Sequence, residues 1–199
     1  MQPTPPLPVF PNESYQTLTT RYEDIHRDVI ESCMQGDVRA QYQLYNLYSK
    51  AMYNICYRMT QQQEEAEDLL QESFSYAFSK LSSFRFESSF GAWLKRIVVN
   101  TCINHFKKRR VDLVLTDQQN DALPDDDQVD YSEIKLEVDR VMKALEQLPR
   151  GYRVVFSLYL LEGYDHKEIS EILEITESTS KSQFLRAKLK MKEILMSDE

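Results

Sequence analysis

The chain has 199 residues, with 32 acidic and 24 basic side chains and a net charge of −8 at pH 7. This charge argues against a nonspecific nucleic-acid binder, although a segregated basic face could still bind DNA. Only four glycines occur, which disfavours sheet-rich folds and glycine-loop sites, and no apolar stretch is long enough to cross a membrane. We therefore expect an all-α protein without membrane insertion.

Residues 1–20 are rich in proline and lack helical periodicity, so we predict a disordered tail there. The segment has no basic region followed by an apolar run, and we do not expect a signal peptide. Three cysteines, Cys33, Cys56 and Cys102, lie far apart in the sequence. Their spacing fits buried, reduced thiols in a cytoplasmic protein rather than a metal site.

Residues 21–111 are predicted to form a first helical domain. Apolar stripes at helical spacing indicate helices near residues 25–33, 38–59, 62–81 and 89–110. Gly36 ends the first stripe, and Asp37 is suited to cap the second helix. That second helix carries apolar and aromatic residues at helical spacing, namely Leu44, Leu47, Tyr48, Met52, Ile55, Cys56 and Met59.

The helix predicted near residues 62–81 has an acidic face opposite an apolar one. The polar face carries Glu64, Asp68, Gln71, Glu72, Ser75 and Ser79, and the apolar face carries Ala66, Leu70, Phe74, Ala77 and Leu81. Negative charge would repel phosphate, so this face should not touch DNA. It is either a solvated surface or a docking site for a basic protein partner.

The loop and helix that follow have the opposite character. The helix near residues 89–110 is apolar around most of its circumference, apart from one narrow polar stripe and a basic end at residues 107–110. Aromatic side chains in the loop could stack on unpaired bases. The candidate single-strand DNA residues are Phe84, Arg85, Phe86, Trp93, Arg96, Asn100, Asn104 and Lys107. Alternatively, this is a core helix with a solvated stripe, and Phe84 and Phe90 belong to the core.

Residues 112–131 are predicted to be an acidic linker, because ten acids and one lysine occur between residues 112 and 139. Residues 132–199 are predicted to form a second helical domain. Helices are expected near residues 132–147 and 149–161, with Pro149 in a first turn. The fold class that we expect is therefore two helical domains joined by an acidic tether.

The end of the second domain has the layout of a helix-turn-helix: a helix at 166–173, a turn at 174–176 and a helix at 177–196. The last helix carries five Lys or Arg and no acid between Ser178 and Lys192. Its candidate DNA-contacting residues are Ser178, Thr179, Lys181, Ser182, Gln183, Arg186 and Lys190, opposite a stripe of Ser180, Phe184, Ala187, Met191 and Ile194 that we expect to be buried. Leu185 and Leu189 fall on the exposed side and could meet a thymine methyl, the other domain or a partner.

Nothing in the sequence resembles a reaction centre. His26, His105 and His166 are isolated from one another, and neither a nucleophile with its base nor a phosphate-binding glycine loop occurs. We expect no catalytic residues, no metal site and no cofactor.

Two segments together resemble the sigma-70 family of RNA polymerase sigma factors. The segment "EEAEDLLQESFSYAFSKLSSF…GAWLKRIVVNTCINHFKKRR" is similar to region 2, and "LEQLPRGYRVVFSLYLLEGYDHKEISEILEITESTSKSQFLRAKLKMKEIL" is similar to region 4. Their order and the short, acidic connection resemble the extracytoplasmic-function group, which keeps only these two domains. Many relatives have glycine in the turn, where this chain has Glu174.

The resemblance implies an initiation factor that binds core RNA polymerase, recognises −35 and −10 promoter elements and promotes DNA melting. Asp68, Gln71 and Glu72 would dock on the clamp helices of the largest polymerase subunit, the loop and polar stripe would contact −10 DNA, and Ser178 to Arg186 would read the −35 element. An anti-sigma factor is a further implied partner. The alternative is a conventional helix-turn-helix regulator with a helical sensor domain, which would bind duplex DNA without polymerase.

Overall fold

The computed structural model describes residues 25–108 and 138–197, and every regular element in these two ranges is helical. The first range contains α1 (Arg27–Met34), α2 (Val38–Thr60), α3 (Gln63–Lys80), a short 3-10 turn (Leu81–Ser83) and α4 (Phe90–Lys108). The second contains α5 (Val138–Gln147), α6 (Arg150–Phe156), a π-helical turn (Ser157–Leu161), α7 (His166–Leu173) and α8 (Glu177–Ser197). The predicted tail and acidic linker lie outside the described residues.

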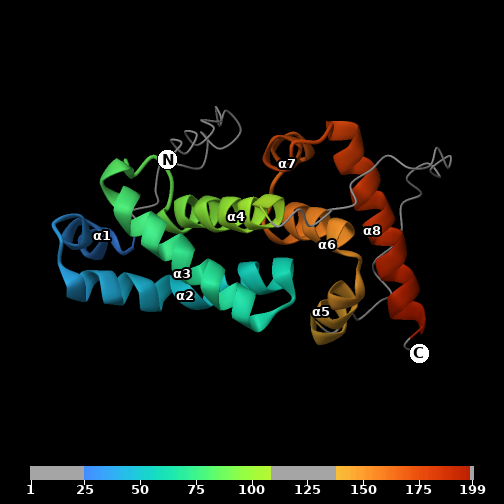
Figure 1. Ribbon diagram of the computed structural model, residues 1–199, viewed down its shortest axis with the longest axis horizontal. Helices are drawn as coiled ribbons and strands as arrows, with labels where there is room; N and C mark the ends of the chain where they lie inside the picture. Colours follow the sequence, from blue (N-terminus) through green and yellow to red (C-terminus); the bar gives the residue numbers. More distant parts are fainter. Residues whose placement is uncertain (1–24, 109–137, 198–199) are drawn as a thin grey trace.

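The two groups of helices lie end to end, with α6 beside the C-terminal end of α4 and α8 at the far end of the molecule (Figure 1). The predicted starts of α2 and α7 are confirmed, and each is marked by a capping side chain. The Asp37 carboxylate accepts hydrogen bonds from the backbone N–H groups of Arg39 and Ala40, at 2.8 and 3.4 Å. Asp165 and Glu168 form a reciprocal capping box at the start of α7, which fixes where the helix-turn-helix begins.

The core of the first helical group is built from the apolar faces of α2, α3 and α4. The apolar face predicted for α3 is confirmed, because Ala66, Leu70, Phe74, Ala77 and Leu81 are all buried. Among the apolar residues of α2, Leu44, Met52, Ile55, Cys56 and Met59 are buried, whereas Leu47 is 44% exposed. At 100° per residue it lies to the side of the narrower stripe that runs through Leu44, Met52 and Met59.

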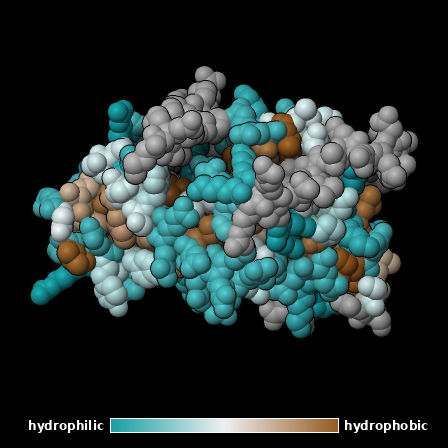
Figure 2. All heavy atoms as spheres, viewed as in Figure 1, coloured by the Kyte–Doolittle hydropathy of each residue, from teal (hydrophilic) through white to brown (hydrophobic). Residues whose placement is uncertain are grey.

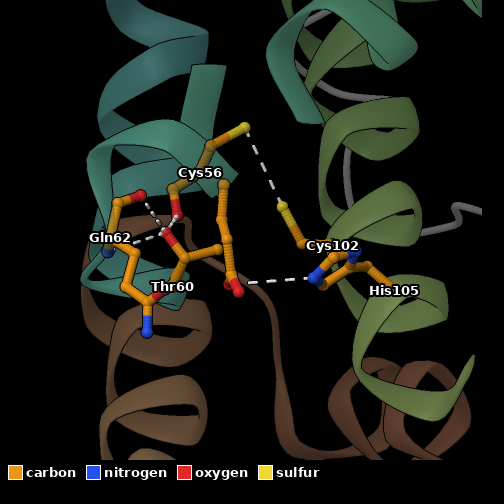
Figure 3. Close-up of polar contacts among 6 residues, drawn as sticks. Cys56, Thr60, Gln62, Cys102 and His105 are labelled. Carbon is orange, nitrogen blue, oxygen red and sulfur yellow. Dashed lines mark hydrogen bonds and ion pairs between the residues drawn. The ribbon is translucent and has the colours of Figure 1, made fainter. Parts of the chain in front are cut away.

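Figure 3 shows polar contacts that link α2, α3 and α4. The Cys102 thiol on α4 donates to the Cys56 sulfur on α2 at 3.8 Å, and this hydrogen bond together with burial raises the Cys102 pKa well above its ordinary value. Nearby, the Thr60 hydroxyl donates to the Cys56 carbonyl at 2.9 Å, and His105 Nε2 lies 3.7 Å from Glu65 Oε2. All three cysteines are free and buried, as predicted.

The apolar core does not stop at the first group of helices. Val154, Val155, Leu158, Tyr164, Ile169 and Leu173, from α6 to α7, belong to the same buried cluster as Leu94 and Ile103 of α4. A second, smaller cluster joins α5, α6 and α8 through Leu145, Leu148, Phe156, Ala187, Met191 and Ile194. The helix-turn-helix is therefore held against the first domain through α6 and α7, while one side of α8 remains outside both cores.

Candidate nucleic-acid interface and partner surface

The helix-turn-helix has the boundaries expected from the sequence, with Glu174, Ile175 and Thr176 between α7 and α8. Glu174 adopts the left-handed conformation, with φ +57° and ψ +44°, and its backbone N–H caps α7 by donating to the Ser170 carbonyl. Glycine adopts this conformation without the steric cost that a Cβ brings. Thr176 caps the start of α8, because its hydroxyl accepts a hydrogen bond from the Thr179 N–H at 3.0 Å.

A histidine fixes the two helices of this motif against each other. His166 Nδ1 at the start of α7 lies 2.9 Å from the Ser180 hydroxyl on α8, and the His166 ring stacks on Tyr159 with centroids 4.4 Å apart. Burial, followed by the nearby positive charge of Lys181, lowers the His166 pKa. The neutral imidazole is therefore the form that suits this junction.

The structure confirms that α8 has an exposed basic side, but two residues predicted for that side are buried. Ser178, Lys181 and Lys190 are exposed, and Ser182 and Arg186 are half-buried. Thr179 and Gln183 were expected to face DNA, yet they are only 5% and 1% exposed. Both predictions of an outward side chain are wrong.

The two corrections have different causes. The Thr179 hydroxyl lies 2.7 Å from the Thr176 hydroxyl and belongs to the cap of α8. Gln183 stands one turn before Ala187, and its angular position lies at the edge of the apolar stripe despite its polarity. Its Oε1 atom is buried without a hydrogen-bond partner in the described residues.

The aromatic loop before α4 combines buried and accessible rings. Phe84 is 6% exposed and packs against Phe90 and Trp93, with centroids 5.7 and 5.3 Å away, so it is a core residue in this arrangement. Arg85 is exposed, while Phe86 and Trp93 are half-buried. Phe86 has a positive φ of 57°, and the Arg27 guanidinium lies 4.5 Å from the centre of its ring. The loop thus presents an exposed arginine and one half-buried aromatic residue, and Trp93 in the first turn of α4 adds a second.

The polar stripe of α4 lies on the surface as predicted. Arg96, Asn104 and Lys107 are exposed, and Asn100 is half-buried. The Lys107 ammonium, however, is already engaged, because it lies 2.8 Å from the carboxylate of Glu174. The stripe therefore ends at the helix-turn-helix of the second domain.

Further polar contacts between the domains were not foreseen from the sequence. The Arg58 guanidinium pairs with the Glu162 carboxylate, and both side chains are largely buried. Lys95 donates to the Glu162 carbonyl at 2.6 Å, and Arg153 donates to the Arg58 carbonyl at 3.1 Å. Burial, with a smaller contribution from Arg150, lowers the Arg153 pKa. No local pattern marks these residues, because their partners are set by tertiary packing.

The acidic face of α3 is exposed along its length. Asp68, Gln71 and Glu72 all lie on the surface, as predicted, together with Glu64, Ser75 and Ser79. Within the described residues, Asp68 and Glu72 form no ion pair. This face can accept a basic partner without first breaking an internal salt bridge.

The exposed surface shown in Figure 2 is mainly hydrophilic, with apolar side chains in small separate patches. No described helix combines the length and apolar composition that crossing a bilayer requires. In the described ranges, no group of three or more His, Cys, Asp or Glu side chains is placed to hold a metal ion.

Comparison with protein families gives two matches in the order expected. The Sigma-70 region 2 family profile matches residues 44–111, which include α3 and α4. The Sigma-70 region 4 profile matches residues 139–191, which include the helix-turn-helix. Together the matches include most of both groups of helices, with α1 and the start of α2 outside them.

Curated proteins and solved structures agree with these matches. The chain is 29% identical over 174 residues to the ECF RNA polymerase sigma factor SigW of Bacillus subtilis, covering 80% of this chain and 90% of that protein. It is 28% identical over 172 residues to the RNA polymerase sigma-H factor of Pseudomonas aeruginosa, covering 81% and 89%. Its fold is similar to that of the sigma factor RpoE solved in complex with the anti-sigma factor NepR from Bartonella quintana, with a TM-score of 0.52, 25% identity and coverage of 81% and 100%.

Proposed function

We propose a division of labour among three surfaces of this chain, which belongs to the extracytoplasmic-function group of the sigma-70 family of RNA polymerase sigma factors. The protein is a transcription initiation factor that binds core RNA polymerase, recognises −35 and −10 promoter elements and promotes DNA melting. Residues 21–111 form the region 2 domain and residues 132–199 the region 4 domain, with residues 112–131 as the acidic tether. Each surface has one role within that activity.

The acidic face of α3 is the surface that holds polymerase. Asp68, Gln71 and Glu72 are exposed on one side of the helix, and the other side is anchored in the core. A basic docking surface, such as the clamp helices of the largest polymerase subunit, complements this charge. The same charge repels DNA and keeps this side of the domain away from the promoter.

The α4 stripe and the preceding loop are the surface for −10 DNA. Arg85 and Arg96 can hold phosphates, and Asn100 and Asn104 can bond base edges. Phe86 and Trp93 are half-buried aromatic residues that suit stacking with an unpaired base. Binding favours the melted promoter only if these groups hold bases better unpaired than paired. Lys107 lies at the end of this surface, where its ammonium also pairs with Glu174.

The exposed side of α8 is the surface for duplex −35 DNA. Ser178, Lys181 and Ser182 lie near the helix start, where side chains of a helix-turn-helix reach base edges. Arg186 can read a guanine or hold a phosphate, and Lys190 suits a phosphate contact. The burial of Thr179 and Gln183 removes them from this set.

An anti-sigma factor is a further proposed partner. RpoE from Bartonella quintana, whose fold is similar, was solved in complex with the anti-sigma factor NepR. A protein that covers the exposed surfaces of this chain would prevent it from reaching polymerase or promoter. We place the factor in the cytoplasm because core polymerase and chromosomal DNA are found there.

The observation that carries this proposal is the arrangement of charge on the matched regions. Region 2 exposes an acidic face on α3, and region 4 exposes a basic face on α8. One chain can therefore bridge a protein machine and DNA. Joining two DNA-binding domains also raises the effective concentration of the second contact once the first has formed.

In vitro transcription tests the proposal directly. Core polymerase with and without the purified chain is incubated with genomic DNA, and transcript start sites are mapped. We expect new starts that share −35 and −10 sequences and require the added chain. Tight binding to duplex operators without polymerase, and no new starts with polymerase, would instead identify the conventional regulator.

A further inference from the structure

The centre of the exposed α8 surface is partly apolar. Directly opposite the side of α8 that packs into the core lie Ser178, Ser182, Leu185 and Leu189, at spacings of four, three and four residues. Leu189 is 43% exposed and Leu185 is half-buried. Within the described residues, neither leucine belongs to the apolar clusters that join the helices or the domains. In the described part of the chain, these two side chains therefore stand apart from the apolar packing that joins α6 and α7 to the first domain.

Positive charge on both flanks determines which occupant this stripe suits. Lys181 lies to one side of Leu185 along the helix surface, and Arg186 lies to the other. The stripe and its basic flanks complement a surface that is negative at its edges and has an apolar group at its centre. A DNA major groove has this character, because phosphates border it and the thymine C5-methyl group lies on its floor.

Position along the helix separates the two leucines. The rise per residue places Leu185 about 12 Å from the start of α8 and Leu189 about 18 Å from it. Residues near the start of the second helix reach base edges, whereas later ones lie further along the groove. Leu185 is therefore placed to contact a base edge. Leu189 has the same side chain on the same side of α8 but lies one turn further from the helix start.

We propose that Leu185 is a specificity-determining residue that contacts the C5-methyl group of a thymine in the −35 element. This inference rests on the proposed placement of α8 in duplex −35 DNA. Loss of a single buried methyl contact weakens an interaction by about fourfold. The contact selects thymine over cytosine, which lacks this methyl group, without adding a hydrogen bond.

The test removes the methyl group from DNA and the side chain from the protein. Holoenzyme made from core polymerase and the full chain is titrated with duplex promoter in which each −35 thymine in turn is replaced by deoxyuridine. We expect about threefold to fivefold weaker binding at one position. Leu185→Ala should abolish that thymine-to-uracil ratio, Leu185→Met should keep most of it, and the matched control Leu189→Ala should leave it unchanged.

Several outcomes would overturn the proposal. The first two concern the wild type: a −35 element without thymine, or equal binding of thymine and deoxyuridine promoters at every position. The other two concern the variants: a thymine-to-uracil binding ratio in Leu185→Ala that equals the wild-type ratio, or loss of this ratio in Leu189→Ala alone. If Leu185→Ala reduced transcription equally from the thymine promoter and from the deoxyuridine promoter, Leu185 would be assigned to a protein contact. A holoenzyme that ignores the −35 sequence altogether would instead contradict the proposed function of α8. Circular dichroism of each variant checks that α8 remains folded.

Discussion

Lys107 of α4 and Glu174 of the helix-turn-helix turn form an ion pair across the two domains, with Nζ and Oε1 2.8 Å apart. Glu174 is also the residue in the left-handed backbone conformation between α7 and α8. One side chain thus joins the turn between α7 and α8 to the basic end of the proposed −10 surface. While the pair is formed, the Glu174 carboxylate offsets the positive charge that Lys107 would offer to a DNA phosphate in the proposed −10 surface.

Two substitutions at Glu174 separate the backbone effect from the ion pair. Both Glu174→Gly and Glu174→Ala remove the carboxylate, but only glycine adopts the left-handed conformation without steric cost. We expect the glycine variant to be more stable than the alanine variant by about 1 kcal/mol. The ion pair itself should contribute below about 1 kcal/mol, because both side chains are substantially exposed. Urea unfolding measures both differences, and equal stability of the two variants would contradict the strained turn.

The Arg58–Glu162 pair should matter more than the Lys107–Glu174 pair. Arg58 and Glu162 are only 16% and 7% exposed, so Glu162→Gln leaves a largely buried guanidinium without its counter-charge. We expect this change to cost about 3 kcal/mol of folding or domain-docking free energy. Glu174→Gln is the matched control and should cost below about 1 kcal/mol. Hydrogen exchange of α2 and α6 reports loss of docking, and similar protection in both variants would contradict this ranking.

The helix boundaries and the buried side of α3 follow from the sequence because apolar spacing and caps are local signals. Asp37 and the helix-turn-helix illustrate this, since each is defined by residues within a few positions of one another. Gln183 shows how polarity can mislead: its angular position near Ala187 predicts burial, whereas its amide suggests exposure. Arg58 and Glu162 are 104 residues apart, and no helical pattern could pair them.

Because Gln183 is buried, its substitution should affect the stability of the protein rather than the recognition of DNA. Its Oε1 atom has no hydrogen-bond partner in the described residues, so Gln183→Met removes an unsatisfied polar group at nearly constant volume. We expect stability to stay level or to rise by up to about 1 kcal/mol, with −35 discrimination unchanged. Arg186→Ala should instead cost about 1–3 kcal/mol of promoter binding. Altered −35 preference in Gln183→Met would return this residue to the DNA-contacting set.

Charge reversal on α3 tests the polymerase surface. Glu72→Lys places a positive charge in the middle of the exposed acidic face, and we expect it to weaken core polymerase binding at least tenfold through like-charge repulsion. Glu67→Lys makes the same charge change at an exposed position outside the proposed contact set and should weaken binding much less. Fluorescence anisotropy of labelled factor measures both affinities. Equal effects would show that total charge, rather than this face, governs binding.

The His166 junction makes the stability of the second domain depend on pH. Because burial and Lys181 lower the folded-state pKa, the unfolded chain takes up a proton first as the pH falls. The contribution of His166 to the unfolding free energy is therefore complete above the unfolded-state pKa of about 6.5. It declines as the pH falls toward the lower pKa of the folded state. His166→Gln cannot titrate, so the wild type should lose more unfolding free energy than this variant between pH 7.5 and 5.5. Urea unfolding at the two pH values measures this difference, and equal losses would show that the imidazole is not held in its neutral form.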